Sequence, residues 1–598
     1  MKPESNSKKL LAITRSKAKM YEFDVPEKEH IAMPKNPSFL FDLTIGILEK
    51  IAYSYSSGEL FETIEKKSNF KDDLLFSSQF FEAYLNSKLN TELDNHMILL
   101  SSAAFYLCDL PGSSSVLIKK IEPGFDLGCS GLDLKLYNRL KYNIGLPKDQ
   151  LLDLRSQIYK TGSDVELIFI DVLIAVTIQK IENSSRNCLS KYTTIPIELW
   201  EHIINKPTFI KEFWPSQRKI GEFGVYDGKS AIIQMPTSAG KTKAIEIIIR
   251  SAFISGRTSL AVIVAPFRAL CHEIHLSLKH QFEGEEIRID EIFNTFQMDI
   301  SIEKITSCSN CILVLTPEKL NYILRHDSEL SQHIGLIIYD EGHLFDDSSR
   351  GVNYELLLSS LKMQMQDDKQ VILISAVVKN SEDLNHWLLN DSGAVISGIN
   401  LTPTPRSIVF SSWRRESGDL IFYNSNEFKE KQFFVPNIIK TEKILNLNSN
   451  KRAIDFPKKK DISKISIYLA LKLAKNGSVA IFSGTKRSAF SQLKKILDAY
   501  KHELLIPKPI EYSDQLEGKR ILHLCIQNFG VDSEISKAAK IGVYLHYGNT
   551  SQGMKMAIEY ALQENKSNLY YALLPWHKEL ISHYVILSFQ GQGKVMKK

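Results

Sequence analysis

An eight-residue segment, MPTSAGKT at positions 235–242, constrains the fold of this chain more than any other feature. The apolar run 231–235 leads into it and predicts a buried parallel strand, and the helical pattern AIEIIIRSAF follows it. A strand, a tight loop and a helix N-terminus in this order present backbone N–H groups to phosphate oxygens. The segment therefore predicts a phosphate-binding loop, which consists of Pro236, Thr237, Ser238, Ala239, Gly240, Lys241 and Thr242.

Two residues of this loop have predicted roles. The lysine of such a loop reaches the β- and γ-phosphates and the following hydroxyl holds Mg²⁺, which assigns these roles to Lys241 and Thr242. The segment departs from the usual pattern at Met235, where glycine is expected. The alternative is a chance match, because Gly-Lys-Thr also occurs in unrelated loops.

A second motif, LIIYDEGH at 336–343, favours the nucleotide interpretation. Its apolar residues 336–339 predict another buried strand, and Asp340 and Glu341 stand at the C-terminal end, where open α/β sheets bind ligands. An aspartate there can hold Mg²⁺ through water, and the adjacent glutamate can orient and deprotonate an attacking water. The two motifs together predict a nucleoside triphosphate site.

Length and composition agree with a multi-domain enzyme of the cytoplasm. A chain of 598 residues corresponds to three or four domains at about 150 residues each. Its net charge of +5 permits a nucleic-acid partner without requiring one. Seven scattered cysteines indicate a reducing compartment, and the CxxC pair Cys308 and Cys311 lacks the further ligands of a zinc site. The longest apolar stretch, 97–110, is too short for a bilayer, so we expect no membrane partner.

Strands and helices alternate between the two motifs as a doubly wound parallel sheet requires. The apolar runs 260–265, 312–315 and 370–374 predict further buried strands. In the segment TPEKLNYILR, Thr316 reads as a helix N-cap and Pro317 as the first helical residue. The sequence therefore predicts one α/β domain with its loops gathered on one edge.

Several motifs, in order, resemble those of the superfamily 2 DExH-box helicases, particularly their superkiller-like branch. They are FWPSQ (213–217), PTSAGKT, APFRALCHE (265–273), LTPEK (315–319), DEGHLFDDSSRGVNYE (340–355) and ISAVVKNSEDLNHWL (374–388). The resemblance implies two RecA-like P-loop NTPase domains that hydrolyse ATP with Mg²⁺ on a single strand of nucleic acid. It also implies catalytic roles for Lys241, Asp340, Glu341 and His343.

The resemblance assigns roles to further residues. Gln217 would read the adenine edge, and Phe213 would either stack on the base or belong to the core. Arg268 and Thr316 would contact the nucleic-acid backbone, although a solvated arginine is the alternative for Arg268. His343 would signal between nucleotide and nucleic acid, or cap a turn. Ser375 would couple hydrolysis to strand movement, with Val377 in place of the family's threonine.

With the remaining sequence included, the whole chain divides into four predicted parts. They are an all-α N-terminal domain (1–200), a first RecA-like ATPase domain (201–400), a crossover and linker with some strand structure (401–460) and a partial second RecA-like domain (461–598). The helical part is either a platform for a protein partner or a plain packing domain. In the second domain, His546 and Gly548 match the family pattern.

The family pattern then stops. The chain has no arginine after Arg520, and Gln590, Gly593 and Lys594 only echo the spacing of motif VI. We therefore expect that motifs V and VI are missing through a frameshift or premature stop after about residue 572. The alternatives are a naturally short regulatory protein and a partner chain that supplies the missing half.

Two functions follow from these expectations. The first is an ATP-dependent nucleic-acid helicase or translocase in shortened form, acting on DNA or RNA. The second is a nucleotide-responsive module that binds nucleic acid or protein with little ATP turnover.

Overall fold

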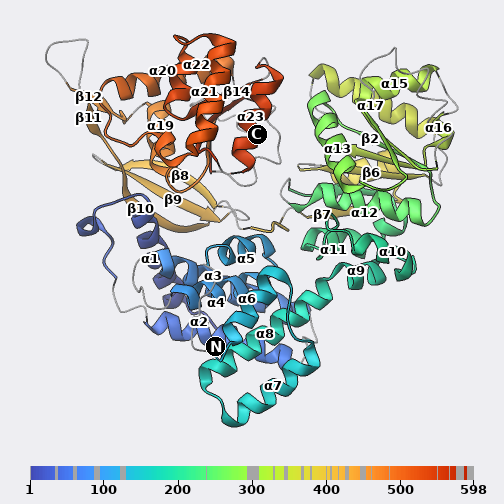
Figure 1. Ribbon diagram of the computed structural model, residues 1–598, viewed down its shortest axis with the longest axis horizontal. Coiled ribbons are helices and arrows are strands. Elements are labelled where there is room, and N and C mark those ends of the chain that lie inside the picture. Colours follow the sequence, from blue (N-terminus) through green and yellow to red (C-terminus); the bar gives the residue numbers. More distant parts are fainter. Residues whose placement is uncertain are drawn as a thin grey trace. The chain divides into compact units, whose positions relative to one another are not determined.

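The chain forms two units in the computed structural model (Figure 1). One unit comprises Met1–Ile45, Gln79–Met97 and Arg406–Lys598, and the other comprises Gly46–Ser78 and Ile98–Pro405. The structure describes all residues except 1, 34–37, 58–63, 87–93, 122–129, 237–238, 292–308, 327–329, 343–347, 365–368, 377–379, 399, 405–406, 415–416, 425–429, 445–452, 460, 484, 548–549, 565, 574–584 and 589–598.

A seven-stranded parallel sheet forms the centre of the second of these units. Its order is β3 (Arg288–Glu291), β4 (Cys311–Leu315), β2 (Leu260–Val264), β5 (Leu336–Asp340), β6 (Gln370–Ser375), β1 (Ala231–Gln234) and β7 (Ala394–Ser397). The predicted doubly wound α/β fold is confirmed. Strands β3 and β7 were not predicted, because four-residue edge strands lack the long apolar run of a buried strand.

Helices cover both faces of this sheet, because successive strand residues point to opposite sides. Ile233, Ile263 and Ile338 pack with helices α10 (Ile197–Ile204), α11 (Pro215–Glu222), α12 (Lys241–Ile254) and α13 (Arg268–Gln281). Residues on the other face pack with α15 (Pro317–His326), α16 (Leu330–His333), α17 (Ser348–Gln364) and α18 (Ser381–Leu389). Figure 1 shows α15 and α17 on one side of the sheet and α12 on the other.

The predicted helical part is confirmed. Its helices are α2 (Ser38–Ser56), α3 (Ile64–Asn86), α4 (Asp94–Leu107), α5 (Pro111–Ile118), α6 (Leu132–Tyr142), α7 (Lys148–Thr161), α8 (Asp164–Asn183) and α9 (Ser185–Tyr192), which together we name the helical region. Helix α8 is buried without interruption from Phe169 to Thr177 and begins with a capping box between Ser163 and Glu166. It therefore forms the axis on which α6 and α7 pack.

The other unit contains an antiparallel sheet of β10 (Lys431–Lys440), β9 (Ser417–Asn424) and β8 (Ser407–Arg414). Strands β11 (Glu442–Ile444) and β12 (Ile454–Phe456) form a separate pair. Helix α1 (Ser5–Glu22) packs on β10, where the Ser16 hydroxyl donates to the Phe434 carbonyl at 2.8 Å. The strand structure predicted within 401–460 is confirmed, but its pairing with an N-terminal helix was not predicted.

A second parallel sheet completes this unit. Its order is β14 (Val543–His546), β15 (Leu569–Leu573), β13 (Val479–Ser483) and β16 (Val585–Ser588). The helices are α19 (Ile462–Leu473), α20 (Lys486–Lys501), α21 (Gln515–Phe529), α22 (Glu534–Lys540) and α23 (Gln552–Gln563). Gly548, Gln590, Gly593 and Lys594 lie outside the described residues. The predicted domain boundaries stay predictions.

Among the described helices, none has both the length and the apolar composition that crossing a membrane requires.

Candidate functional site

The strand order brings the predicted site residues to one edge of the seven-stranded sheet. Strand β6 lies between β5 and β1, with Asp340 paired to Ile374 and Gln234 paired to Ser375. The Met235 amide continues this pairing by donating to the Ser375 carbonyl at 2.9 Å. The acidic motif, Ser375 and the start of the phosphate loop are therefore neighbours at the C-terminal ends of three adjacent strands.

The described part of the phosphate loop has the backbone that its sequence requires. Gly240 has φ +86°, in the left-handed region, and an added Cβ would lie 2.7 Å from Gln217 Nε2. Helix α12 begins at the next residue, Lys241, as predicted. The side chain of Met235, the residue that departs from the usual pattern, is buried in the core. Thr237 and Ser238 lie outside the described residues.

Lys241 and Glu341 face each other in the interior. Lys241 Nζ lies 3.7 Å from Glu341 Oε1, and the two residues are only 6% and 5% exposed. Within the described residues, the ammonium group has this ion pair but makes no hydrogen bond. A buried ammonium with unused N–H donors is costly, and phosphate oxygens would satisfy them. These residues therefore fit a bound triphosphate.

The turn after β5 is held from several sides. Glu341 has φ +56°, a left-handed conformation that costs a non-glycine residue about 1–2 kcal/mol. The Glu341 amide donates to Asp340 Oδ1 at 2.9 Å, and the Tyr354 hydroxyl donates to the Asp340 carbonyl at 3.2 Å. An added Cβ on Gly342 would lie 2.5 Å from Leu373. The strained glutamate is thus fixed beside the lysine, as functional residues in strained conformations often are. His343 lies outside the described residues.

The segment containing Gln217 is bonded to the phosphate loop. Gln217 Oε1 accepts from the Trp214 amide at 2.8 Å, and Nε2 donates to the Gly240 carbonyl at 3.4 Å. The Ser216 hydroxyl donates to the Ala239 carbonyl. Phe213 is 1% exposed and packs edge to face against Tyr226, so the structure supports its core interpretation over base stacking. The adenine role of Gln217 stays a prediction.

Arg268 and Thr316 also lie at this edge. They follow the adjacent strands β2 and β4, and the Ala265 amide donates to the Leu315 carbonyl at 3.0 Å. Arg268 is exposed at the start of α13, whereas Thr316 is buried before α15. Burial, and then the charge of Arg268, lower the pKa of Lys319. Two cations and two helix N-termini therefore form a surface suited to phosphate groups.

Lys319 was missed as a site residue. It belongs to the LTPEK motif, and its position on the first turn of α15 was the available signal. Its proximity to Arg268 depends on the pairing of β2 with β4, which sequence reasoning did not use.

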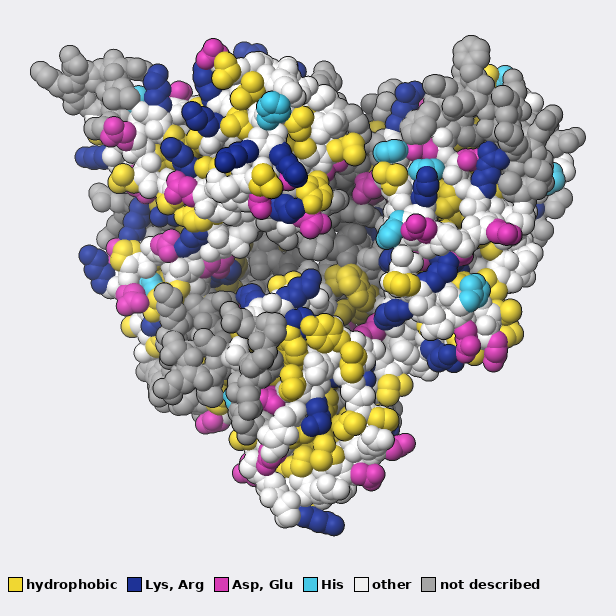
Figure 2. Space-filling model, in the orientation of Figure 1, with side chains coloured by type: hydrophobic (Ala, Val, Ile, Leu, Met, Phe, Trp, Pro, Cys, Tyr) yellow, Lys and Arg dark blue, Asp and Glu magenta, His cyan; other side chains and the backbone are white. Residues whose placement is uncertain are grey.

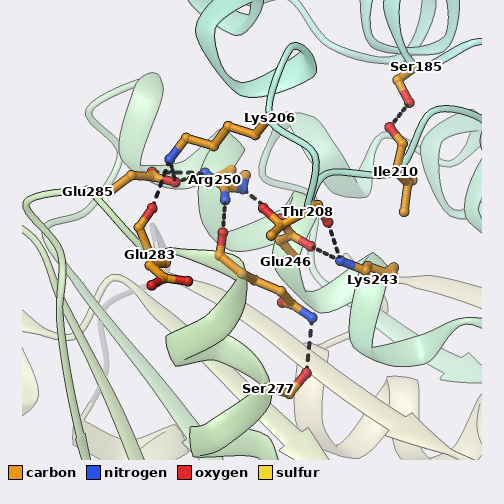
Figure 3. A network of polar contacts seen from close by, with 11 residues as sticks. Ser185, Lys206, Thr208, Ile210, Lys243, Glu246, Arg250, Ser277, Glu283 and Glu285 are labelled. Carbon is orange, nitrogen blue, oxygen red and sulfur yellow. Dashed lines mark hydrogen bonds and ion pairs between the residues drawn. The ribbon is translucent and has the colours of Figure 1, made fainter.

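A buried network of hydrogen bonds and ion pairs fixes α12, the helix that begins in the phosphate loop (Figure 3). Arg250, near the end of α12, donates to Glu246 at 3.0 Å, to Glu285 at 2.9 Å and to the Gln281 carbonyl at 2.9 Å. Lys243 on the same helix donates to the Thr208 carbonyl at 2.9 Å. The network joins α12 to the end of α13 and to the segment before Gln217. Breaking such a buried ion pair costs about 3–5 kcal/mol, so the network fixes the direction of α12.

Comparisons with known proteins agree with this geometry. The DEAD/DEAH box helicase family matches residues 215–384. Hachiman protein HamB of Bacillus cereus is 28% identical over 353 residues, which cover 58% of this chain and 31% of that protein. The ATP-dependent DNA helicase Hel308 of Thermococcus kodakarensis is 30% identical over 207 residues, which cover 35% of this chain and 17% of that protein.

Among solved structures, the Mycobacterium smegmatis helicase Lhr bound to ssDNA and AMP-PNP is 15% identical, with a TM-score of 0.39 over 64% of this chain and 42% of Lhr. The matched regions span less than a third of HamB and less than a fifth of the Thermococcus Hel308.

The phosphate loop and the acidic motif both lie within residues 215–384, the part of the chain that matches the DEAD/DEAH box helicase family. The predicted resemblance to superfamily 2 DExH-box helicases is confirmed for that part of the chain.

Proposed function

We propose that this protein hydrolyses ATP and uses the energy to move along, or to unwind, nucleic acid. The observation that carries the proposal is the buried pair of Lys241 and Glu341, in which the ammonium has unused donors and the glutamate occupies a strained turn. The helicase relatives and the family match support it.

The chain's own residues divide the chemical work. Lys241 and the backbone of the loop ending at Gly240 would bind the β- and γ-phosphates, and Thr242 and Asp340 would hold Mg²⁺. When bound, Mg²⁺ neutralises charge on the phosphate oxygens. Glu341 would orient a water molecule and accept its proton as that water attacks the γ-phosphorus. The burial of Lys241 and Glu341 strengthens the interactions of both side chains with the substrate.

Ser375 would couple hydrolysis to movement. Its carbonyl accepts from the Met235 amide, and its strand lies between those that carry the acidic motif and the phosphate loop. A conformational change in the acidic motif would therefore be transmitted through β6 to the phosphate loop, and the reverse. The role of His343 as a signal between nucleotide and nucleic acid is part of this proposal.

An ATPase assay with and without single-stranded nucleic acid tests the proposal. A helicase or translocase is expected to hydrolyse ATP faster when the strand is present, and to displace one strand of a duplex. Absence of ATP hydrolysis with both single-stranded DNA and RNA would contradict the motor function.

Arg268→Ala is expected to weaken nucleic-acid binding to a similar extent for all sequences, because the proposed contact is to phosphate. The slope of log affinity against log salt concentration should fall in magnitude by about 1. Fluorescence anisotropy with several single-stranded oligonucleotides at a series of salt concentrations measures both effects.

Arg325→Ala is the matched control, since Arg325 is exposed at the opposite end of α15 from Thr316. It should leave the salt slope unchanged. A sequence-dependent loss for Arg268→Ala, or an unchanged salt slope, would argue against the backbone contact.

A second candidate function is a nucleotide-responsive module that binds a protein through the helical region. Figure 2 shows hydrophobic side chains gathered over helices α6 to α8. The exposed residues there include Leu134, Tyr142, Ile144, Tyr159 and Val165. Large exposed apolar patches often mark protein-binding sites. Little ATP turnover together with stable capture of a protein by this surface would favour this alternative.

Location in the cytoplasm stays a proposal from the sequence.

A further inference from the structure

The segment that leads into Gln217 is held by the helical region through its backbone. The Ser185 hydroxyl donates to the Ile210 carbonyl at 2.6 Å (Figure 3), and the Ser185 amide donates to the Lys211 carbonyl at 3.0 Å. The Phe213 amide donates to the Asn183 carbonyl at 2.8 Å. Residues 210–213 therefore lie alongside the end of α8 and the start of α9 and are hydrogen-bonded to them.

Charged side chains add a second set of contacts. Glu212 accepts a hydrogen bond from the Tyr106 hydroxyl at 2.6 Å and forms an ion pair with Lys180. Arg218, on the same helix as Gln217, donates through Nη2 to Asp109 Oδ1 at 2.8 Å. Its other terminal nitrogen, Nη1, donates to the Phe213 carbonyl at 2.9 Å. Arg218 thus connects α11 both to the segment before it and to Asp109, which lies just after the end of α4.

Asp109 is suited to hold this arginine. It follows α4 with φ +65°, and its second oxygen also pairs with Lys71 of α3. Burial by itself raises the pKa of Asp109. The positive charges of Arg218 and Lys71 outweigh this effect, so the pKa lies below its ordinary value. The carboxylate therefore stays charged at neutral pH and makes charge-assisted hydrogen bonds.

The opposite side of α11 reaches the phosphate loop. Ser216 donates to the Ala239 carbonyl and Gln217 donates to the Gly240 carbonyl. A continuous series of contacts thus runs from Asp109 through Arg218 and Gln217 to Gly240.

The Asp109–Arg218 pair also borders a cavity of about 340 Å³, whose lining includes Tyr55, Lys71 and Gln179. The two side chains are 17% and 16% exposed, respectively. Because water can reach this ion pair, the two side chains can separate without opening a packed apolar core.

We propose that Arg218 is a positioning residue, through which Asp109 of the helical region holds Gln217 at the nucleotide site and so sets the preference for adenine. This inference rests on the proposed function, because it requires that the site binds ATP. It extends that function by making the helical region part of nucleotide selection.

The test compares the binding of ATP, GTP and inorganic triphosphate to the full chain and its variants by isothermal titration calorimetry. In Arg218→Gln, ATP affinity is expected to fall about tenfold, the effect of losing a hydrogen bond to a charged group. Triphosphate affinity should be unchanged, because Lys241 and the phosphate loop remain, and the ratio of ATP to GTP affinity should fall. Asp109→Asn should act in the same direction, and the double variant should be no worse than Arg218→Gln alone.

Two controls keep the test specific. Arg218→Lys keeps the positive charge and should retain most of the ATP preference even if Arg218→Gln folds poorly. Arg186→Gln removes an exposed ion pair between Arg186 of α9 and Glu201 of α10 and should leave all three affinities unchanged.

The outcomes separate this inference from the proposed function. An equal loss of ATP and triphosphate affinity in Arg218→Gln, or unchanged affinities, would overturn the positioning role while leaving ATP binding intact in the parent chain. A parent chain that binds neither ATP nor triphosphate would instead overturn the proposed function and this inference with it.

Discussion

Replacing Lys241 with alanine is expected to abolish ATP hydrolysis to within measurement and to weaken ATP binding strongly. The ammonium is the buried cation of the site, and losing one preorganised charged donor typically slows an enzyme by about 10²–10³-fold. The variant also leaves the Glu341 carboxylate buried without its neighbouring cation. This unpaired negative charge would repel the phosphates. Nucleotide binding by calorimetry and phosphate release by a coupled assay measure the two effects.

Lys279→Ala is the matched control for this variant. Lys279 is exposed near the end of α13 and should be replaceable without loss of ATP hydrolysis. Unchanged nucleotide affinity and turnover in Lys241→Ala would remove the phosphate-loop assignment and the proposed function together.

The Glu341→Gln variant is expected to keep ATP bound while hydrolysis stops. An amide preserves the size of the side chain but cannot accept the proton of the attacking water, and the loss of a general base costs about 10²–10⁴-fold in rate. ATP affinity should stay equal or rise, because an anion beside Lys241 has been removed. Single-turnover hydrolysis and nucleotide binding, measured on the same preparation, separate these two effects.

Glu382→Gln provides the comparison, since Glu382 is exposed in the first turn of α18. It should hydrolyse ATP at the parental rate. If Glu341→Gln also did so, another group would have to act as the base, and the strained turn at Glu341 would need a different explanation.

Much of the sheet was predictable because its strands are local features. The central strands of a parallel sheet are covered on both faces and appear as uninterrupted apolar runs, as in β2, β4, β5 and β6. The start of α12 was predictable for the same kind of reason, since small residues, Gly240 and an apolar helical pattern occur in sequence. Lys241, Asp340 and Glu341 were named from these local patterns.

Other features depended on pairings between distant parts of the chain. The approach of Lys319 to Arg268 follows from the contact of β4 with β2, and the burial of Arg250 follows from the end of α13 packing on α12. Helix α1 packs on β10 from more than 400 positions away in the sequence. No local pattern of hydrophobicity or charge specifies such partners.

The sequence by itself therefore determined the class of fold, the position of the phosphate loop and the acidic residues at the end of β5. These depend on short-range periodicity and on the backbone freedom of residues such as Gly240. Only the tertiary structure decided that Lys241 faces Glu341, that Phe213 lies in the core and that Arg218 pairs with Asp109. Burial and ion pairing are properties of neighbours in space, and folding brings those neighbours together from distant positions in the chain.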